Sequence, residues 1–146
     1  NQTEHPEYMT ESGTFAVPVI FYQPGSTLKG HIDAIAQQID IMPTVLGYLG
    51  YDKPYISFGC DLLATPTNQT SAVNYIGGVY QYHKGRYLLQ FDGKESVALY
   101  DFVSDRLLEH NLLGTLPEMQ SSMESELKAI IQQYMTRMNT DKLVFE

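Results

Sequence analysis

The hydrophobic positions change their period along the chain, and each change predicts a different element. The first apolar run, "TFAVPVIFYQPG" over residues 14–25, is rich in Val, Ile, Phe and Tyr and is closed by Pro-Gly. Such a run predicts a short strand buried on both faces, as in a parallel or mixed sheet. Pro18 inside the run has no N–H to donate, so we expect an edge, a strand start or a bulge at that point.

A helical period follows in "IDIMPTVLGYLG", residues 39–50. Asp40 is a favourable N-cap, and Pro43 falls in the first turn, where a missing N–H has little consequence. Gly50 is placed to end the helix in a left-handed conformation. One face of this short helix is apolar and is formed by Ile41, Met42, Val45, Leu46 and Leu49.

From Val73 the pattern becomes that of strands separated by turns. β-Branched and aromatic residues occur in runs, with turn signals at residues 83–85 and 92–93. Three antiparallel strands are expected near residues 73–82, 86–91 and 96–101. Tyr80 and Tyr82 lie two apart and therefore share a face of the first strand.

The last predicted element is an amphipathic helix of about twenty residues. Thr115 with Glu118 three residues later matches a capping box, and Pro117 falls in the first turn. Helical spacing relates Leu116, Met119, Met123, Leu127, Ile130, Ile131, Tyr134 and Met138. The methionines suit an adaptable binding groove, but packing on the sheet is the interpretation we favour.

Composition and charge limit the classes of function. With 43% hydrophobic and 18% charged residues, the 146-residue chain is suited to one packed domain, not to disorder. A net charge of −8 argues against nucleic-acid binding and against electrostatic docking on anionic membranes. The single cysteine, Cys60, excludes an internal disulfide and a Cys-x-x-Cys metal site. The chain does not begin with Met, and we expect it to be a fragment of a longer protein.

The histidines show no spacing typical of a metal site on a helix. They are His5, His31, His83 and His110. We expect His31 and His83 to be exposed, in a loop and in a hairpin turn. No nucleophile elbow, P-loop or zinc-protease motif occurs, and neither glycine pair, at residues 77–78 and at 47 and 50, follows a strand and opens a helix.

The densest polar group is in "LYDFVSDRLLEHNLLG", residues 99–114. Asp101, Asp105 and Asn111 could supply oxygen ligands to calcium, but the spacing of an EF-hand is absent. Short polar side chains also shape loops by bonding to nearby backbone groups. We favour loop shaping over a metal site.

This stretch resembles a signature found near the C-terminus of sulfatases, in the alkaline phosphatase superfamily. The matching positions are Leu99, Tyr100, Asp101, Asp105, Asn111 and Leu112. Arg106 stands where the family usually has Pro, and Leu108 where it usually has Glu. In that family the stretch is a structural connection after the small C-terminal sheet, so the resemblance implies a scaffold role.

Three further segments resemble the same family and occur in its order. Residues 40–46 resemble its "D-(I/L)-x-P-T-(L/I)-L" helix, and residues 15–25 resemble its strand between Val-Pro and Pro-Gly. Residues 58–64, "FGCDLLA", resemble a segment of the lipoteichoic acid synthase-like branch, which includes phosphoglycerol transferases. Together the four segments extend over about two-thirds of the chain.

The resemblance implies an α/β fold: a partial alkaline-phosphatase-like sheet and helix, then a small antiparallel sheet and a long C-terminal helix. Residues 1–72 would be the C-terminal end of the catalytic core, and residues 73–146 the small sheet and last helix. The family acts on phosphate or sulfate esters through a Thr, Ser or formylglycine nucleophile and a divalent metal (Mn, Mg, Ca or Zn). The resemblance also implies that the longer protein is bacterial and membrane-anchored, with an extracytoplasmic or periplasmic catalytic domain. The fragment itself is expected to be soluble.

No residue of this chain matches the family's nucleophile or metal ligands, so the fragment alone should be inactive and hold no cofactor. The one substrate-binding candidate is His5, because a histidine that titrates near neutrality can bind a phosphate or sulfate oxygen. An ordinary loop histidine is the alternative. The implied partner is the preceding part of the catalytic domain, and a homodimer through the uncovered surface is a second hypothesis. The alternative hypothesis for the whole chain is a non-catalytic binding or interaction domain with a tyrosine-rich surface.

Overall fold

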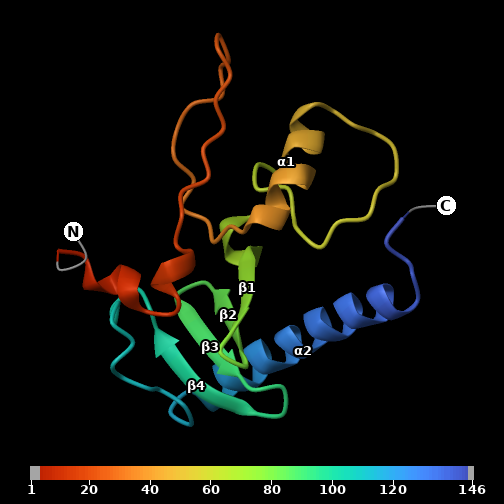
Figure 1. Ribbon diagram of the computed structural model, residues 1–146. Helices are drawn as coiled ribbons and strands as arrows, with labels where there is room; N and C mark the ends of the chain where they lie inside the picture. The colour runs from red at the N-terminus through yellow and green to blue at the C-terminus, as the bar shows by residue number, and fades with distance from the viewer. Residues whose placement is uncertain (1–3, 145–146) are drawn as a thin grey trace.

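The computed structural model describes residues 4–144 and has a mixed α/β fold (Figure 1). A four-stranded antiparallel sheet in the order β1-β2-β3-β4 carries the long helix α2 on one face. This confirms the expected small antiparallel sheet and long C-terminal helix. The elements are α1 Ile41–Tyr48, β1 Ser71–Ile76, β2 Val79–Lys84, β3 Tyr87–Phe91, β4 Ser96–Asp101 and α2 Pro117–Asn139.

The first predicted strand, residues 73–82, is wrong because it contains a turn. β1 and β2 form a hairpin in which Ile76 pairs with Val79. The two turn residues are Gly77 and Gly78, with φ angles of 61° and 86°. A two-residue turn of this kind requires positive φ at both positions, which glycine adopts without strain. Apolar residues on both sides of the glycines concealed the turn in the hydrophobic pattern.

The prediction that His83 is exposed in a turn is also wrong, since His83 lies within β2 and is buried. The turn after β2 falls two residues later, at residues 85–86. Side chains alternate along a strand. Tyr80 and Tyr82 therefore face α2, as expected for a shared face, while Gln81 and His83 point to the opposite side of the sheet.

The core lies between one face of the sheet and the first half of α2. Its buried cluster is formed by Tyr82, Leu89, Phe91, Leu99, Met123 and Leu127. At the edge of this cluster the Tyr82 hydroxyl donates to Glu126 Oε2 at 2.8 Å. Burial of the Tyr82 ring, with Glu126 beside it, raises the pKa of the hydroxyl. The favoured prediction, that the helix packs on the sheet, is therefore confirmed.

The start of α2 differs from the predicted capping box. The N-cap is Leu116, and Pro117 is the first helical residue. The Thr115 hydroxyl donates to the Leu112 carbonyl at 2.6 Å and so does not cap the helix. The reason is that the helix begins one residue later than the box requires. Glu118 remains in the first turn, where its charge interacts favourably with the helix dipole.

The other face of the sheet contacts residues 4–15, here called the N-terminal segment. Ser12 Oγ lies 2.6 Å from His83 Nε2. Gln81 Nε2 donates to Glu11 Oε2 at 2.9 Å. The segment contains two 3-10 turns, Pro6–Met9 and Gly13–Phe15. The sheet is thus covered on both faces, by α2 on one side and by a short irregular layer on the other.

α1 begins directly after Asp40, at the predicted N-cap position, although the Asp40 side chain makes no capping bond to it and a 3-10 turn, Gln38–Asp40, comes before it. Its predicted end is confirmed. Gly50 has a φ of 67°, and the Tyr51 N–H donates to the Leu46 carbonyl at 3.0 Å. This bond across a left-handed glycine is the mark of a Schellman motif.

The strand predicted over residues 14–25 is not formed. In the structure this segment projects away from the sheet beside α1, and the side chains of Val17, Ile20 and Tyr22 are exposed (Figure 1). A strand exists only where a neighbour completes its hydrogen bonds. Among the described residues no strand lies beside this segment, and Pro18 removes one donor. Residues 14–25 are therefore apolar, as the sequence shows, but several of their side chains are exposed instead of buried.

Candidate functional site

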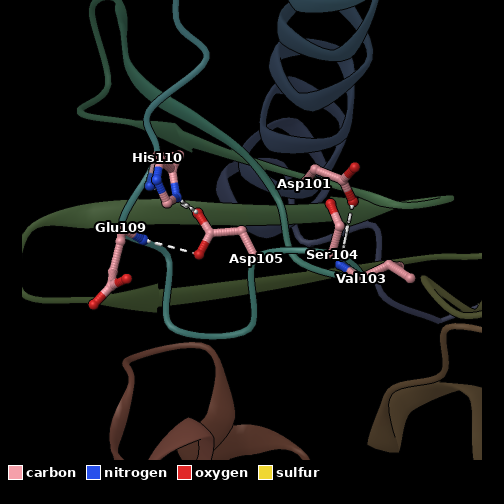
Figure 2. Close-up of polar contacts among 6 residues, drawn as sticks. All are labelled: Asp101, Val103, Ser104, Asp105, Glu109 and His110. Atoms are coloured by element: carbon pink, nitrogen blue, oxygen red, sulfur yellow. Dashed lines mark hydrogen bonds and ion pairs between the residues drawn. The ribbon is translucent and has the colours of Figure 1, made fainter.

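Residues 101–114 are called the acidic loop; it begins at Asp101, the last residue of β4, and continues beyond the strand (Figure 2). Asp101 Oδ1 accepts the N–H groups of Val103 and Ser104, each at 3.3 Å. Its Oδ2 lies 2.5 Å from a guanidinium nitrogen of Arg86, in the β2-β3 turn. The hydrogen bond from Arg86, helped by Ser104, lowers the pKa of Asp101 to about 2.

Asp105 shapes the middle of the acidic loop in the same way. Its Oδ2 accepts the backbone N–H of His110 at 2.7 Å, and its Oδ1 accepts that of Glu109 at 3.1 Å (Figure 2). The bond from the His110 N–H is the largest cause of the lowered pKa of this carboxyl. The loop closes through Leu108, which has a φ of 57°, a conformation that non-glycine residues adopt rarely. The Asp105 carboxylate thus fixes a tight turn.

Asn111 ties the acidic loop back to the sheet. Its Oδ1 accepts the N–H groups of Leu99 at 3.0 Å and Leu113 at 2.9 Å. The Leu112 N–H donates to the Leu99 carbonyl at 2.7 Å. The Asn111 side chain and the chain after it therefore take the place of a further strand at the edge of β4. The loop-shaping interpretation of these polar residues is borne out by their bonds.

Within residues 4–144, one group of three side chains has the composition of a metal site. It consists of Asp105, Glu109 and His110, whose ligand atoms lie within 4.8 Å of one another. Both Asp105 oxygens already accept backbone N–H groups, while Glu109 and His110 are exposed. The bonds of the Asp105 carboxylate to the loop account for this arrangement of side chains without a metal ion.

A second set of polar contacts joins α1 to the segment at residues 58–64, and we call it the α1 clasp. The Asp40 side chain is 1% exposed, and its two oxygens accept the N–H groups of Gln37 and Cys60, each at 2.8 Å. Thr44 Oγ1 donates to the Asp40 carbonyl at 2.6 Å and accepts the Leu62 N–H at 3.0 Å. The buried side chains of Asp40 and Thr44 thus provide acceptors for two N–H groups of the facing segment, those of Cys60 and Leu62.

Two glycines allow the close approach that the α1 clasp needs. A Cβ at Gly59 would overlap the Ile39 carbonyl oxygen and lie 2.6 Å from Asp40 Oδ1. A Cβ at Gly47 would overlap the carboxylate of Asp61. The sequence predicted Asp40 as a helix cap but gave no sign that its carboxylate reaches Cys60. The glycine in "FGCDLLA" was the available signal, because a glycine in such a place often marks close backbone contact.

His5, the sequence-predicted substrate residue, lies at the start of the N-terminal segment. Its side chain is exposed, with Nδ1 3.4 Å from Glu7 Oε1 and its ring edge-on to Tyr8 at 5.9 Å. The substrate-binding role of His5 stays a prediction.

Sequence reasoning missed the contact between Ser12 and His83. The bond of 2.6 Å joins a hydroxyl to an imidazole, as in nucleophilic dyads. His83 Nδ1, however, is buried without a hydrogen-bond partner, so no third group orients the ring. Burial lowers the pKa of His83 to about 4. This pairing joins two layers and lacks the orienting group of a catalytic triad.

An exposed apolar surface runs over α1 and the projecting segment beside it. Its members are Val17, Ile20, Phe21, Tyr22, Leu28, Ile32, Ile41, Met42, Val45, Tyr48 and Leu49. Pro43 and Thr44 are the buried residues of α1, so the predicted apolar face is the exposed one. A hollow of about 130 Å³ lies between the projecting segment and α1, lined in part by Phe21, Leu28 and Tyr48. Exposed apolar side chains gathered in this way make this region a candidate contact surface.

No protein-family model matches the chain, and no curated protein matches it at a significant level. Over residues 4–144, no helix combines the length and apolar character needed to span a membrane.

Proposed function

We propose that the chain is the C-terminal part of a metal-dependent sulfatase-family enzyme, most like a lipoteichoic acid synthase or phosphoglycerol transferase. The observation that carries this proposal is the α1 clasp. Residues 40–46 and 58–64, which carry two of the family-like motifs, contact one another through Asp40 and Thr44. The acidic loop, which carries a third motif, is likewise held by its own polar residues. Motif residues with structural bonds are what a scaffold portion of such an enzyme would have.

In this proposal the chain supplies structure while the chemistry belongs to the preceding part of the catalytic domain. The divalent metal there would lower the pKa of a Thr, Ser or formylglycine nucleophile and neutralise the ester oxygens. An acceptor alcohol or water would then resolve a covalent intermediate. Of the described residues, His5 is our candidate for contact with the phosphate or sulfate group.

The exposed apolar surface supports the proposal that this chain packs against another part of the enzyme. All of its members except Ile32 come from residues 12–28 and 41–51, which contain no Asp, Glu, Lys or Arg although the chain has a net charge of −8. Transfer of such a surface from water is favourable by roughly 25 cal/mol per Å² of apolar area. We propose that the preceding part of the catalytic domain covers it, and that a second copy of the chain is the alternative occupant.

Activity of the natural longer protein and of this chain, measured side by side, tests the proposal. The substrates are p-nitrophenyl sulfate and a phosphoglycerol lipid, each with added manganese. We expect turnover by the longer protein alone, and the preferred substrate then separates sulfatase from transferase. Metal-dependent turnover by this chain would overturn the proposal, as would a longer protein that is inactive on both substrates. Inactivity of the longer protein would instead favour a binding or interaction domain.

A further inference from the structure

The contact between the N-terminal segment and the sheet depends on an imidazole with unusual surroundings. His83 is 8% exposed and lies between Ala72 of β1 and Leu88 of β3 in the strand register. The ring of Phe102 meets it edge-on at 5.4 Å. On the remaining side the Ser12 hydroxyl closes the site at 2.6 Å from Nε2. A neutral imidazole fits this apolar enclosure.

We propose that His83 holds the N-terminal segment on the sheet only while its ring is neutral, so that mild acid releases this segment. A neutral ring carries one proton, and in the tautomer that places it on Nε2 this N–H donates to the Ser12 hydroxyl, which leaves Nδ1 unprotonated. A protonated ring donates from both nitrogens. Nδ1 is buried and has no acceptor, so its added proton would be an unpaired donor in an apolar site. Release of the N-terminal segment exposes His83 to water and removes that penalty.

Charged groups on the neighbouring elements do not offset the charge of a protonated ring. The N-terminal segment brings Glu11, whose carboxylate accepts a hydrogen bond from Gln81. β1 and β3 present the apolar residues Ala72 and Leu88. The turn after β4 brings Phe102, preceded by Asp101, which is paired with Arg86. Burial is accordingly the cause of the lowered pKa of His83.

The sign of the pH effect follows from linkage. The released segment leaves His83 with its ordinary pKa near 6.5, whereas the docked segment holds the pKa at about 4. The released state therefore binds more protons between these two values, and docking weakens as the pH falls through this window. The docking constant should fall about thirtyfold between pH 7.5 and pH 5. Most carboxylates stay ionised over that range.

Amide NMR spectra of the whole chain between pH 7.5 and pH 5 test this proposal. The signals of Gly13 and Phe15 should move toward those of a free segment, in step with the titration of the His83 ring. Signals of Leu89 and Leu99 in the core should stay constant. Titration of His83 near pH 6.5 while the segment stays docked would overturn the proposal. Loss of core signals together with those of the segment would also overturn it, because the sheet would then be unfolding.

Two variants distinguish the role of His83 from other effects of low pH on the protein. His83→Gln cannot ionise but keeps a side-chain N–H that can donate to the Ser12 hydroxyl, and should keep the segment docked down to pH 5. His110→Gln makes the same change at an exposed histidine of the acidic loop and should respond to acid as the unaltered chain does. An acid response that persists in a folded His83→Gln protein would contradict the proposal. If that variant does not fold, the titration of the unaltered chain still decides.

Discussion

At the scale of single residues, buried or clustered acids in this chain accept backbone N–H groups. Asp40 is the strongest case, because its buried carboxylate accepts the N–H of Gln37 in its own turn and that of Cys60 in the facing segment. Asp101 and Asp105 do the same within the acidic loop. A carboxylate in such a role contributes to the stability of the fold, because its oxygens are bonded to backbone N–H groups.

Replacement of Asp40 by Ala should lower the free energy of unfolding by about 2 kcal/mol or more, because two N–H groups lose their acceptors. Urea denaturation followed by circular dichroism measures the change. Asp33→Ala removes the same charge from an exposed position and should change stability by less than about 0.5 kcal/mol. Equal effects of the two changes would mean that charge, and not the α1 clasp, accounts for the loss.

Arg86→Ala should raise the pKa of Asp101 from about 2 toward its ordinary value. Because the folded-state pKa is depressed, the carboxylate stabilises the fold above about pH 4, and this stabilisation is lost as the pH falls toward 2. The variant should show a smaller loss over that range. NMR titration of the Asp101 carboxyl gives the value. An unchanged pKa in Arg86→Ala would assign the shift to the Ser104 and Val103 bonds alone.

At the scale of elements, close approach between α1 and residues 58–64 depends on glycine. Gly59→Ala should lower the free energy of unfolding by roughly 1–3 kcal/mol, since its Cβ meets the backbone of Ile39. Gly47→Ala should be less costly, because the Asp61 side chain can turn away and alanine favours the helix by about 1 kcal/mol. Denaturation of both variants measures the difference. A larger loss for Gly47→Ala would contradict the geometry of the α1 clasp.

The sequence predicted elements well where local chemistry decides them. The end of α1 at Gly50 and the amphipathic face of α2 follow from residue conformation and helical period. Two local signals, the turn at Gly77 and Gly78 and the capping box at Thr115, were misjudged, and other predictions failed because distant partners decide the outcome. The strand expected over residues 14–25 needs a neighbouring strand, and the burial of His83 depends on which residues of the hairpin pair. The loop-shaping bonds of the acidic loop were foreseeable because they join residues close together in the sequence.

At the scale of the whole molecule, the packed part and the exposed apolar surface belong to different elements. The sheet, α2 and the acidic loop form a packed unit, with its core cluster around Leu89 and Leu99. α1 and the projecting segment beside it present the exposed apolar surface. Among the described residues this apolar surface has no covering layer, whereas the loops of the packed unit are fixed by their own polar side chains.

The central claim is that the motif residues of this chain hold loops and do not bind a catalytic metal. Calorimetric titration of the chain with manganese, and separately with calcium, tests it most directly. We predict no saturable binding at micromolar concentrations of either ion, and the same result for Asp105→Asn. Stoichiometric binding that is lost in Asp105→Asn would contradict the account and would make Asp105, Glu109 and His110 a metal site.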